Sequence, residues 1–124
     1  MKKLAPFILA GGFLLLSSCY YDTREAPEVP DIPDSEEISF SEDIQPILNQ
    51  CTQCHNGSNA NPDLREGSSY NALVPVYVEE GNAEGSLFYQ KLPGVGHPFD
   101  VGFVLSADDI ARIKTWIDRG ADNN

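Results

Sequence analysis

The chain carries one five-residue motif, Cys51-Thr52-Gln53-Cys54-His55, that constrains its fold more than any other feature. Two thiols three positions apart lie on the same face of a helix or turn, and a histidine follows the second thiol directly. This spacing is typical of sites where each thiol has added to a vinyl group of haem and the histidine binds the iron axially. The motif therefore predicts covalently attached haem c, with Cys51 and Cys54 as attachment points and His55 as an axial iron ligand.

The third cysteine, Cys19, has a separate explanation at the N-terminus. Residues 1–18 contain two lysines, then an apolar stretch from Leu4 to Leu16, then two serines directly before Cys19. This order is typical of a secretory signal peptide, and the apolar stretch is shorter than the roughly 20 residues that a transmembrane helix needs. Because Leu16-Ser17-Ser18-Cys19 also resembles a bacterial lipobox, we predict a lipoprotein signal peptide over 1–18 and lipidation of Cys19.

Lipidation of Cys19 would place the protein in the bacterial cell envelope, since two or more acyl chains give stable membrane attachment. We expect it to face the periplasm or to be carried by the outer membrane. The alternative is an ordinary secreted protein with a stray thiol.

Export favours haem attachment over two other uses of a Cys-x-x-Cys pair. A structural zinc site needs four ligands, and only His97 remains beside the motif once Cys19 is lipidated. A thioredoxin-like redox pair needs alternating strands and helices, and no such pattern follows the motif.

The net charge of the chain limits the kinds of binding partner that we expect. The whole chain has a net charge of -11, and removal of the signal peptide with its two lysines makes the mature protein -13. This acidity argues against nucleic acid as a partner, because phosphate binding needs clustered Lys and Arg. A separate, basic redox protein of the envelope could be steered by this field, although an acidic surface also simply favours solubility.

The mature chain divides into a tether and one small domain. Residues 20–37 contain Pro27, Pro30 and Pro33, seven acidic residues and a single base. This composition favours an extended, solvated chain, so we predict an acidic, Pro-rich tether over 19–37. The folded domain is expected over 38–122.

Apolar spacing in this domain predicts an all-α fold. A first helix has Ser39 or Ser41 as its N-cap, and Pro46 could delay its start. A last helix begins at the N-cap Ser106 and ends near Gly120, and short helical pieces are expected over 68–73 and 86–92. The predicted buried faces consist of Phe40, Ile44, Ile47, Leu48 and Cys51 in the first helix, and Ile110, Ile113, Trp116 and Ile117 in the last. A bound haem would supply much of the core that so small a domain lacks.

The segments 40–48, 51–55, 86–92 and 105–121 resemble the small monohaem cytochrome c domains of bacterial envelope proteins. The resemblance extends over about Ile38 to Ala121. It implies the class I cytochrome c fold, in which the N- and C-terminal helices pack across each other beside the haem. It also implies electron transfer as the role. We expect that the protein is not itself an enzyme and that any enzyme it serves is a separate polypeptide.

One departure from the family concerns the second axial ligand. Domains of this kind usually supply a methionine in a Met-Pro pair shortly before the last helix, whereas this chain has no methionine except Met1. His97-Pro98 stands close to that position, so we predict His97 as the sixth iron ligand and a lower reduction potential than in Met-ligated relatives. The alternative is that His97 lies in a solvent-facing loop or near a propionate, leaving the iron five-coordinate.

Five-coordinate iron would bind a small gas or peroxide, and Asp100 and Arg65 are the conceivable polar groups for peroxide cleavage. In a third hypothesis the haem stabilises a structural or recruitment module.

The carbonyl of Pro62 is a candidate acceptor for the second ring nitrogen of His55. Trp116 is expected in the core, and five other aromatic residues are candidates for the pocket wall: Tyr70, Phe88, Tyr89, Phe99 and Phe103.

Overall fold

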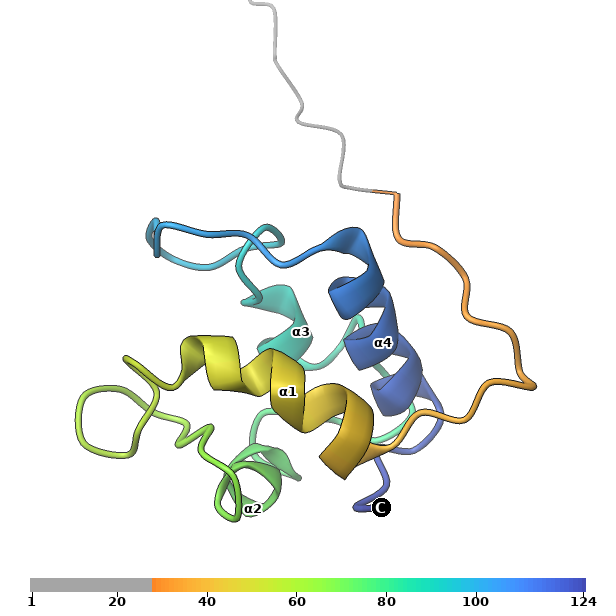
Figure 1. Cartoon of the computed structure of the whole chain (residues 1–124), viewed down its shortest axis with the longest axis horizontal. Helices are drawn as coiled ribbons and strands as arrows, with labels where there is room; N and C mark the ends of the chain where they lie inside the picture. Colours follow the sequence, from red (N-terminus) through yellow and green to blue (C-terminus); the bar gives the residue numbers. More distant parts are fainter. Residues whose placement is uncertain (1–27) are drawn as a thin grey trace, which may run out of the picture.

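The structure, a computed structural model, describes residues 28–124, so the signal peptide, Cys19 and the first part of the tether lie outside the described residues. Every regular element within 28–124 is helical and none is a strand, which confirms the all-α prediction for this part (Figure 1). The elements in order are η1 (Phe40–Ile44), α1 (Gln45–Leu48), η2 (Asn49–Cys51), α2 (Ser69–Leu73), α3 (Leu87–Gln90) and α4 (Ala107–Asp118). None of these helices combines the length and the apolar character needed to cross a membrane.

The first three elements form one continuous helical segment whose winding changes along its length. The Ser39 hydroxyl caps it by accepting from the Glu42 N–H at 3.3 Å, as predicted. The first turn is a π-turn, in which the Gln45 N–H donates to the carbonyl of Phe40, five residues earlier. Pro46 then stands in the first turn of α1, where its missing N–H costs least. The segment thus accommodates a proline and still delivers Cys51 at its far end.

The start of this segment is also held by Asn124. The Phe40 N–H donates to the Asn124 side-chain oxygen at 2.8 Å, and the Ser41 N–H donates to the Asn124 carbonyl at 2.9 Å. The first N–H groups of a helix have no partner within the helix, so these bonds satisfy two of them. The ordered structure therefore runs two residues past the expected boundary at 122.

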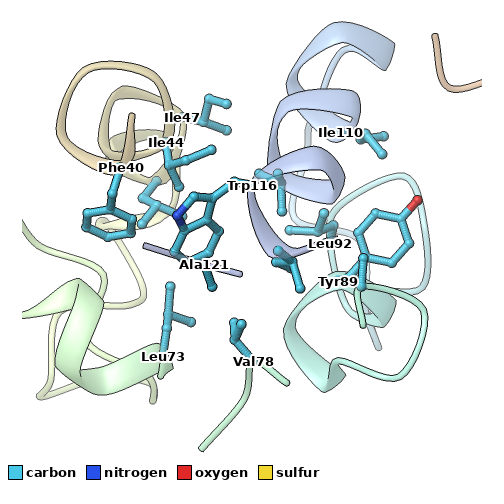
Figure 2. Packing of buried hydrophobic residues seen from close by; sticks show 14 of the residues in the cluster. Phe40, Ile44, Ile47, Leu73, Val78, Tyr89, Leu92, Ile110, Trp116 and Ala121 are labelled. Atoms are coloured by element: carbon cyan, nitrogen blue, oxygen red, sulfur yellow. The ribbon is translucent and has the colours of Figure 1, made fainter. Parts of the chain in front are cut away.

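The segment packs against α4, which begins at the predicted cap: the Ser106 hydroxyl accepts from the Asp109 N–H at 3.0 Å. Phe40 and Trp116 bring their ring centroids to 5.2 Å, and Tyr70 of α2 meets Phe40 edge-on at the same distance. Figure 2 shows side chains from all these elements converging on Trp116. The predicted face residues of both helices are buried, except that Cys51 is half-buried: Phe40, Ile44, Ile47, Leu48, Ile110, Ile113, Trp116 and Ile117.

Residues 28–37, which we call the strap, run beside α4 instead of being solvated along their whole length (Figure 1, orange). Val29 and Ile32 pack against the core. The Arg119 guanidinium donates to the carbonyls of Ile32 at 3.2 Å, Pro33 at 3.1 Å and Glu36 at 2.5 Å. This differs from the expected tether, whose composition favours solvation.

Candidate functional site

The Cys51–His55 motif occupies the turn that ends the first helical segment. The N–H groups of Cys54 and His55 both donate to the Cys51 carbonyl, at 3.2 and 2.9 Å. The turn brings both cysteines to the wall of one pocket, and both thiols are free. Burial raises the pKa of the Cys51 thiol, and its interaction with Cys54 raises it further. The half-buried Cys51 is therefore held as a neutral thiol at neutral pH, while Cys54 is exposed.

The orientation of His55 is fixed by one backbone carbonyl. Its Nδ1 lies 3.1 Å from the carbonyl oxygen of Pro62, which is the acceptor expected from the sequence. Because a carbonyl only accepts, Nδ1 carries the proton and donates it. The other nitrogen, Nε2, is left with a lone pair, which is the form of imidazole that binds a metal.

The loop that supplies this carbonyl is closed at its ends and tied to the first helical segment. The Leu64 N–H donates to the His55 carbonyl at 2.9 Å, and the Leu64 carbonyl accepts from the buried Gln45 side-chain amide at 3.1 Å. The Gln45 oxygen accepts from the buried Ser69 hydroxyl of α2. Gly57 turns this loop with φ 73°, and a Cβ there would lie 2.8 Å from an Asp63 carboxylate oxygen. A buried polar network thus holds the loop that orients His55.

The pocket beside the motif has a volume of about 410 Å³, within the usual range for small-molecule and cofactor sites. Its wall is mostly apolar and comes from the motif turn, the 55–64 loop, α3 and the 93–103 loop. Beyond the motif residues and His97, its lining includes Leu64, Tyr77, Leu87, Phe88, Lys91, Leu92, Pro93, Phe99, Val101 and Phe103.

His97 lies on the wall of the same pocket and is half-buried. Its Nδ1 lies 2.9 Å from the carbonyl oxygen of Phe99, so by the same reasoning Nδ1 is the donor and Nε2 keeps its lone pair. The Phe99 ring meets the imidazole edge-on, with centroids 4.7 Å apart. The structure therefore brings together all four of the predicted cofactor residues within 28–124: Cys51, Cys54, His55 and His97.

The other candidates divide clearly. Phe88, Phe99 and Phe103 line the pocket, whereas Tyr70 and Tyr89 do not. Asp100 and Arg65 also lie off the pocket wall: Asp100 accepts from the Gly102 N–H at 2.8 Å, and Arg65 pairs with Asp63 at 2.6 Å.

Trp116 is buried in the core and does not line the pocket, in agreement with the prediction. Gln45 and Lys91 were missed by the sequence analysis. The available sequence signal for Gln45 was a glutamine within an apolar helix face, whereas no sequence signal pointed to Lys91.

Within residues 28–124, His, Cys, Asp and Glu side chains form no group of three or more that could hold a metal ion.

Comparison of the chain with family models, with curated proteins and with solved structures gives no match. The functional assignment therefore depends on the residues of the pocket themselves.

Proposed function

We propose that this protein is a monohaem c-type cytochrome of the class I fold, lipid-anchored in the bacterial cell envelope, which exchanges electrons with a separate redox protein. One observation carries the proposal. Two thiols at haem-attachment spacing share an apolar pocket with two histidines, and each histidine has its Nδ1 bonded to a backbone carbonyl.

The residues of the pocket fit covalently held haem in size and in chemistry. The volume of about 410 Å³ suits a cofactor that is partly open to solvent, and the apolar wall suits a porphyrin face. Cys51 and Cys54 supply the two sulfurs for thioether bonds, and the Nε2 atoms of His55 and His97 supply two nitrogen donors. Phe40 packs against Trp116, so the first and last helices contact each other, and this contact supports the proposed fold.

Haem supplies a reversible one-electron iron couple when it is bound. The chain's own residues tune this couple. The Pro62 carbonyl makes His55 a stronger donor by accepting its Nδ1–H, and the Phe99 carbonyl does the same for His97. The apolar wall limits solvent access, and ligation by two histidines lowers the reduction potential relative to a Met-ligated site.

The experiment is an absorption spectrum of the chain from Cys19 onward, matured in a periplasm that attaches haem, reduced, and then exposed to carbon monoxide. We expect covalent haem and a reduced spectrum that carbon monoxide leaves unchanged, because His97 fills the sixth site. The variant His97→Ala should bind carbon monoxide readily. Asp100→Ala is the matched control, since Asp100 lies in the same loop but off the pocket wall.

Two results would contradict the proposal in different ways. Absence of covalent haem in the matured chain would remove the cytochrome assignment altogether. Rapid carbon monoxide binding by the unaltered protein would show an open sixth site and would favour the gas- or peroxide-binding alternative.

A further inference from the structure

Lys91 is the one residue with a full charge on the wall of the pocket. The remaining lining residues are apolar, neutral polar, cysteine or histidine, and no carboxylate is among them. The Lys91 side chain is exposed, so its ammonium group stays hydrated and is available to a negatively charged group that enters the pocket.

The other four cations of the described part each have a carboxylate partner. Arg65 pairs with Asp63 at 2.6 Å and Lys114 with Asp118 at 2.6 Å. Arg112 lies 3.2 Å from both Glu36 and Asp43, and Arg119 lies 3.5 Å from Asp34. Within residues 28–124 Lys91 alone has no ion pair, although the whole chain has 19 acidic residues against 8 basic ones. The charge of Lys91 is therefore not neutralised by any described carboxylate.

The backbone of Lys91 is fixed while its side chain remains exposed. Its N–H donates to the carbonyls of Leu87 and Phe88 at the end of α3, at 3.1 and 3.2 Å. The Phe88 N–H in turn donates to the Tyr77 carbonyl at 2.9 Å, so α3 is anchored on the pocket wall. A lysine placed in this way lays its aliphatic stem along apolar surface and keeps its ammonium group at the mouth.

Building on the proposed function, we propose that Lys91 is a positioning residue that pairs with a propionate of the bound haem at the mouth of the pocket. Haem carries two propionate carboxylates, and Lys91 is the only fixed charge on the wall that can oppose them. A cation at this position favours the reduced iron, which carries one positive charge fewer, over the oxidised iron. Lys91 therefore raises the reduction potential as well as fixing the orientation of the haem edge.

A purely local role for Lys91 makes a different prediction. A lysine at a helix C-terminus interacts favourably with the last carbonyls, and this would affect stability alone. The size of the change in reduction potential separates the two roles, because a cation paired with a propionate acts on the iron at shorter range than one directed at the helix carbonyls.

The test uses the matured, haem-bearing chain with Lys91→Gln and Lys91→Arg, and with Lys114→Gln as the matched control. Lys114→Gln removes the same charge from α4, off the pocket wall. Spectroelectrochemistry at low salt should give a two- to fivefold lower ratio of reduced to oxidised haem for Lys91→Gln at a fixed potential. That ratio corresponds to about 20 to 40 mV at 59 mV per tenfold change.

Lys91→Arg should keep the wild-type potential, and Lys114→Gln should shift it less than Lys91→Gln does. The difference between wild type and Lys91→Gln should shrink at 1 M salt, where charges on an exposed surface are screened. Lys91→Leu is a second neutral variant in case Lys91→Gln does not yield folded protein.

The outcomes separate this inference from the proposed function. A matured wild-type chain without haem would contradict the proposed function and this inference with it. If haem is attached, a potential that is equal in wild type and Lys91→Gln, or a shift no larger than that of Lys114→Gln, would overturn the role of Lys91 alone. A changed iron-ligand spectrum in Lys91→Gln would also overturn it, because it would place Lys91 at the iron.

Discussion

At the scale of single residues, the two histidines of the pocket make the same kind of hydrogen bond. Each uses Nδ1 to donate to a backbone carbonyl, His55 to Pro62 and His97 to Phe99. The carbonyls fix the tautomer, so both Nε2 atoms are available as lone-pair donors in the same pocket. The orientation of His55 depends further on Gln45, which holds the Leu64 end of the same loop.

Gln45→Leu should destabilise the protein by about 2–6 kcal/mol. The substitution leaves the buried Leu64 carbonyl and the buried Ser69 hydroxyl without their partner, and each such loss costs about 1–3 kcal/mol. Urea denaturation of the matured protein measures the change. Asn49→Ala is the control, because Asn49 accepts a bond from the same Gln45 amide but is itself exposed, so we expect less than 1 kcal/mol.

The double variant Gln45→Leu/Ser69→Ala should recover part of the loss, since it removes the orphaned hydroxyl as well. A Gln45→Leu protein as stable as wild type would show that the network does not support the loop.

The sequence predicted those contacts of the candidate site that lie within one short segment. Cys51, Cys54 and His55 lie on one pocket wall, and His55 contacts the Pro62 carbonyl that the sequence proposes as its acceptor. Gln45 and Lys91 could not be found in this way, because their roles depend on segments far away in the chain. Only folding brings Gln45 to the Leu64 carbonyl and Lys91 to the pocket wall.

At the scale of elements, caps and buried faces followed from sequence, but the first turn and the strap did not. Ser39 and Ser106 cap their helices as predicted. The π-turn before Pro46 is one of several ways in which a helix can accommodate a proline, and tertiary packing selects among them. The strap is held mainly through its backbone carbonyls. Every residue type has such a carbonyl, so amino-acid composition cannot predict these contacts.

Arg119→Ala should release the strap from α4. The guanidinium donates to three strap carbonyls and lies near the Asp34 carboxylate, so its loss removes most of the polar attachment. Loss of about 1–2 kcal/mol of local stability corresponds to a 5- to 30-fold larger open population. A glutamate-specific protease, which cuts after Glu36 and Glu37, should therefore cleave the variant 5- to 30-fold faster.

Arg65→Ala is the matched control, because its exposed pair with Asp63 lies in the 55–65 region and not on the strap. Its cleavage rate after Glu36 and Glu37 should equal that of the wild type. An Arg119→Ala protein cleaved no faster than this control would mean that Val29, Ile32 and the Arg112–Glu36 pair hold the strap without Arg119.

At the scale of the whole molecule, the all-α architecture could be predicted from the sequence, because apolar periodicity is a property of each helix by itself. The contacts that join the two ends of the domain could not be predicted in this way. Asn124 completes the start of the first helical segment, and Arg112 joins α4 to both η1 and the strap. Such contacts depend on how the two ends of the chain meet, which no local pattern specifies.

The net charge of the chain makes a final prediction about electron exchange. The full chain has a net charge of -11, which removal of the two signal-peptide lysines changes to -13, so the matured protein should attract cations and repel anions. Oxidation of the reduced, matured protein by hexaammineruthenium(III) should therefore slow about tenfold between 10 mM and 0.5 M salt, whereas oxidation by ferricyanide should accelerate. Stopped-flow absorption measures both rates, and a neutral quinone, whose rate should not change, is the control.

This measurement also compares the effect of the overall acidic charge on electron exchange with the effect of Lys91 at the pocket. A preference for ferricyanide that is lost in salt would instead mean that no propionate neutralises Lys91 and that its positive charge governs exchange at the pocket. Slow exchange with all three oxidants would favour the structural-module alternative over an electron carrier. The predicted pattern, with the cationic oxidant preferred and the preference lost in salt, requires that the summed acidic charge dominate. That charge acts over a longer range at 10 mM salt, where the Debye length is about 30 Å, than at 0.1 M salt, where it is about 10 Å. A natural partner would then be expected to present a basic face.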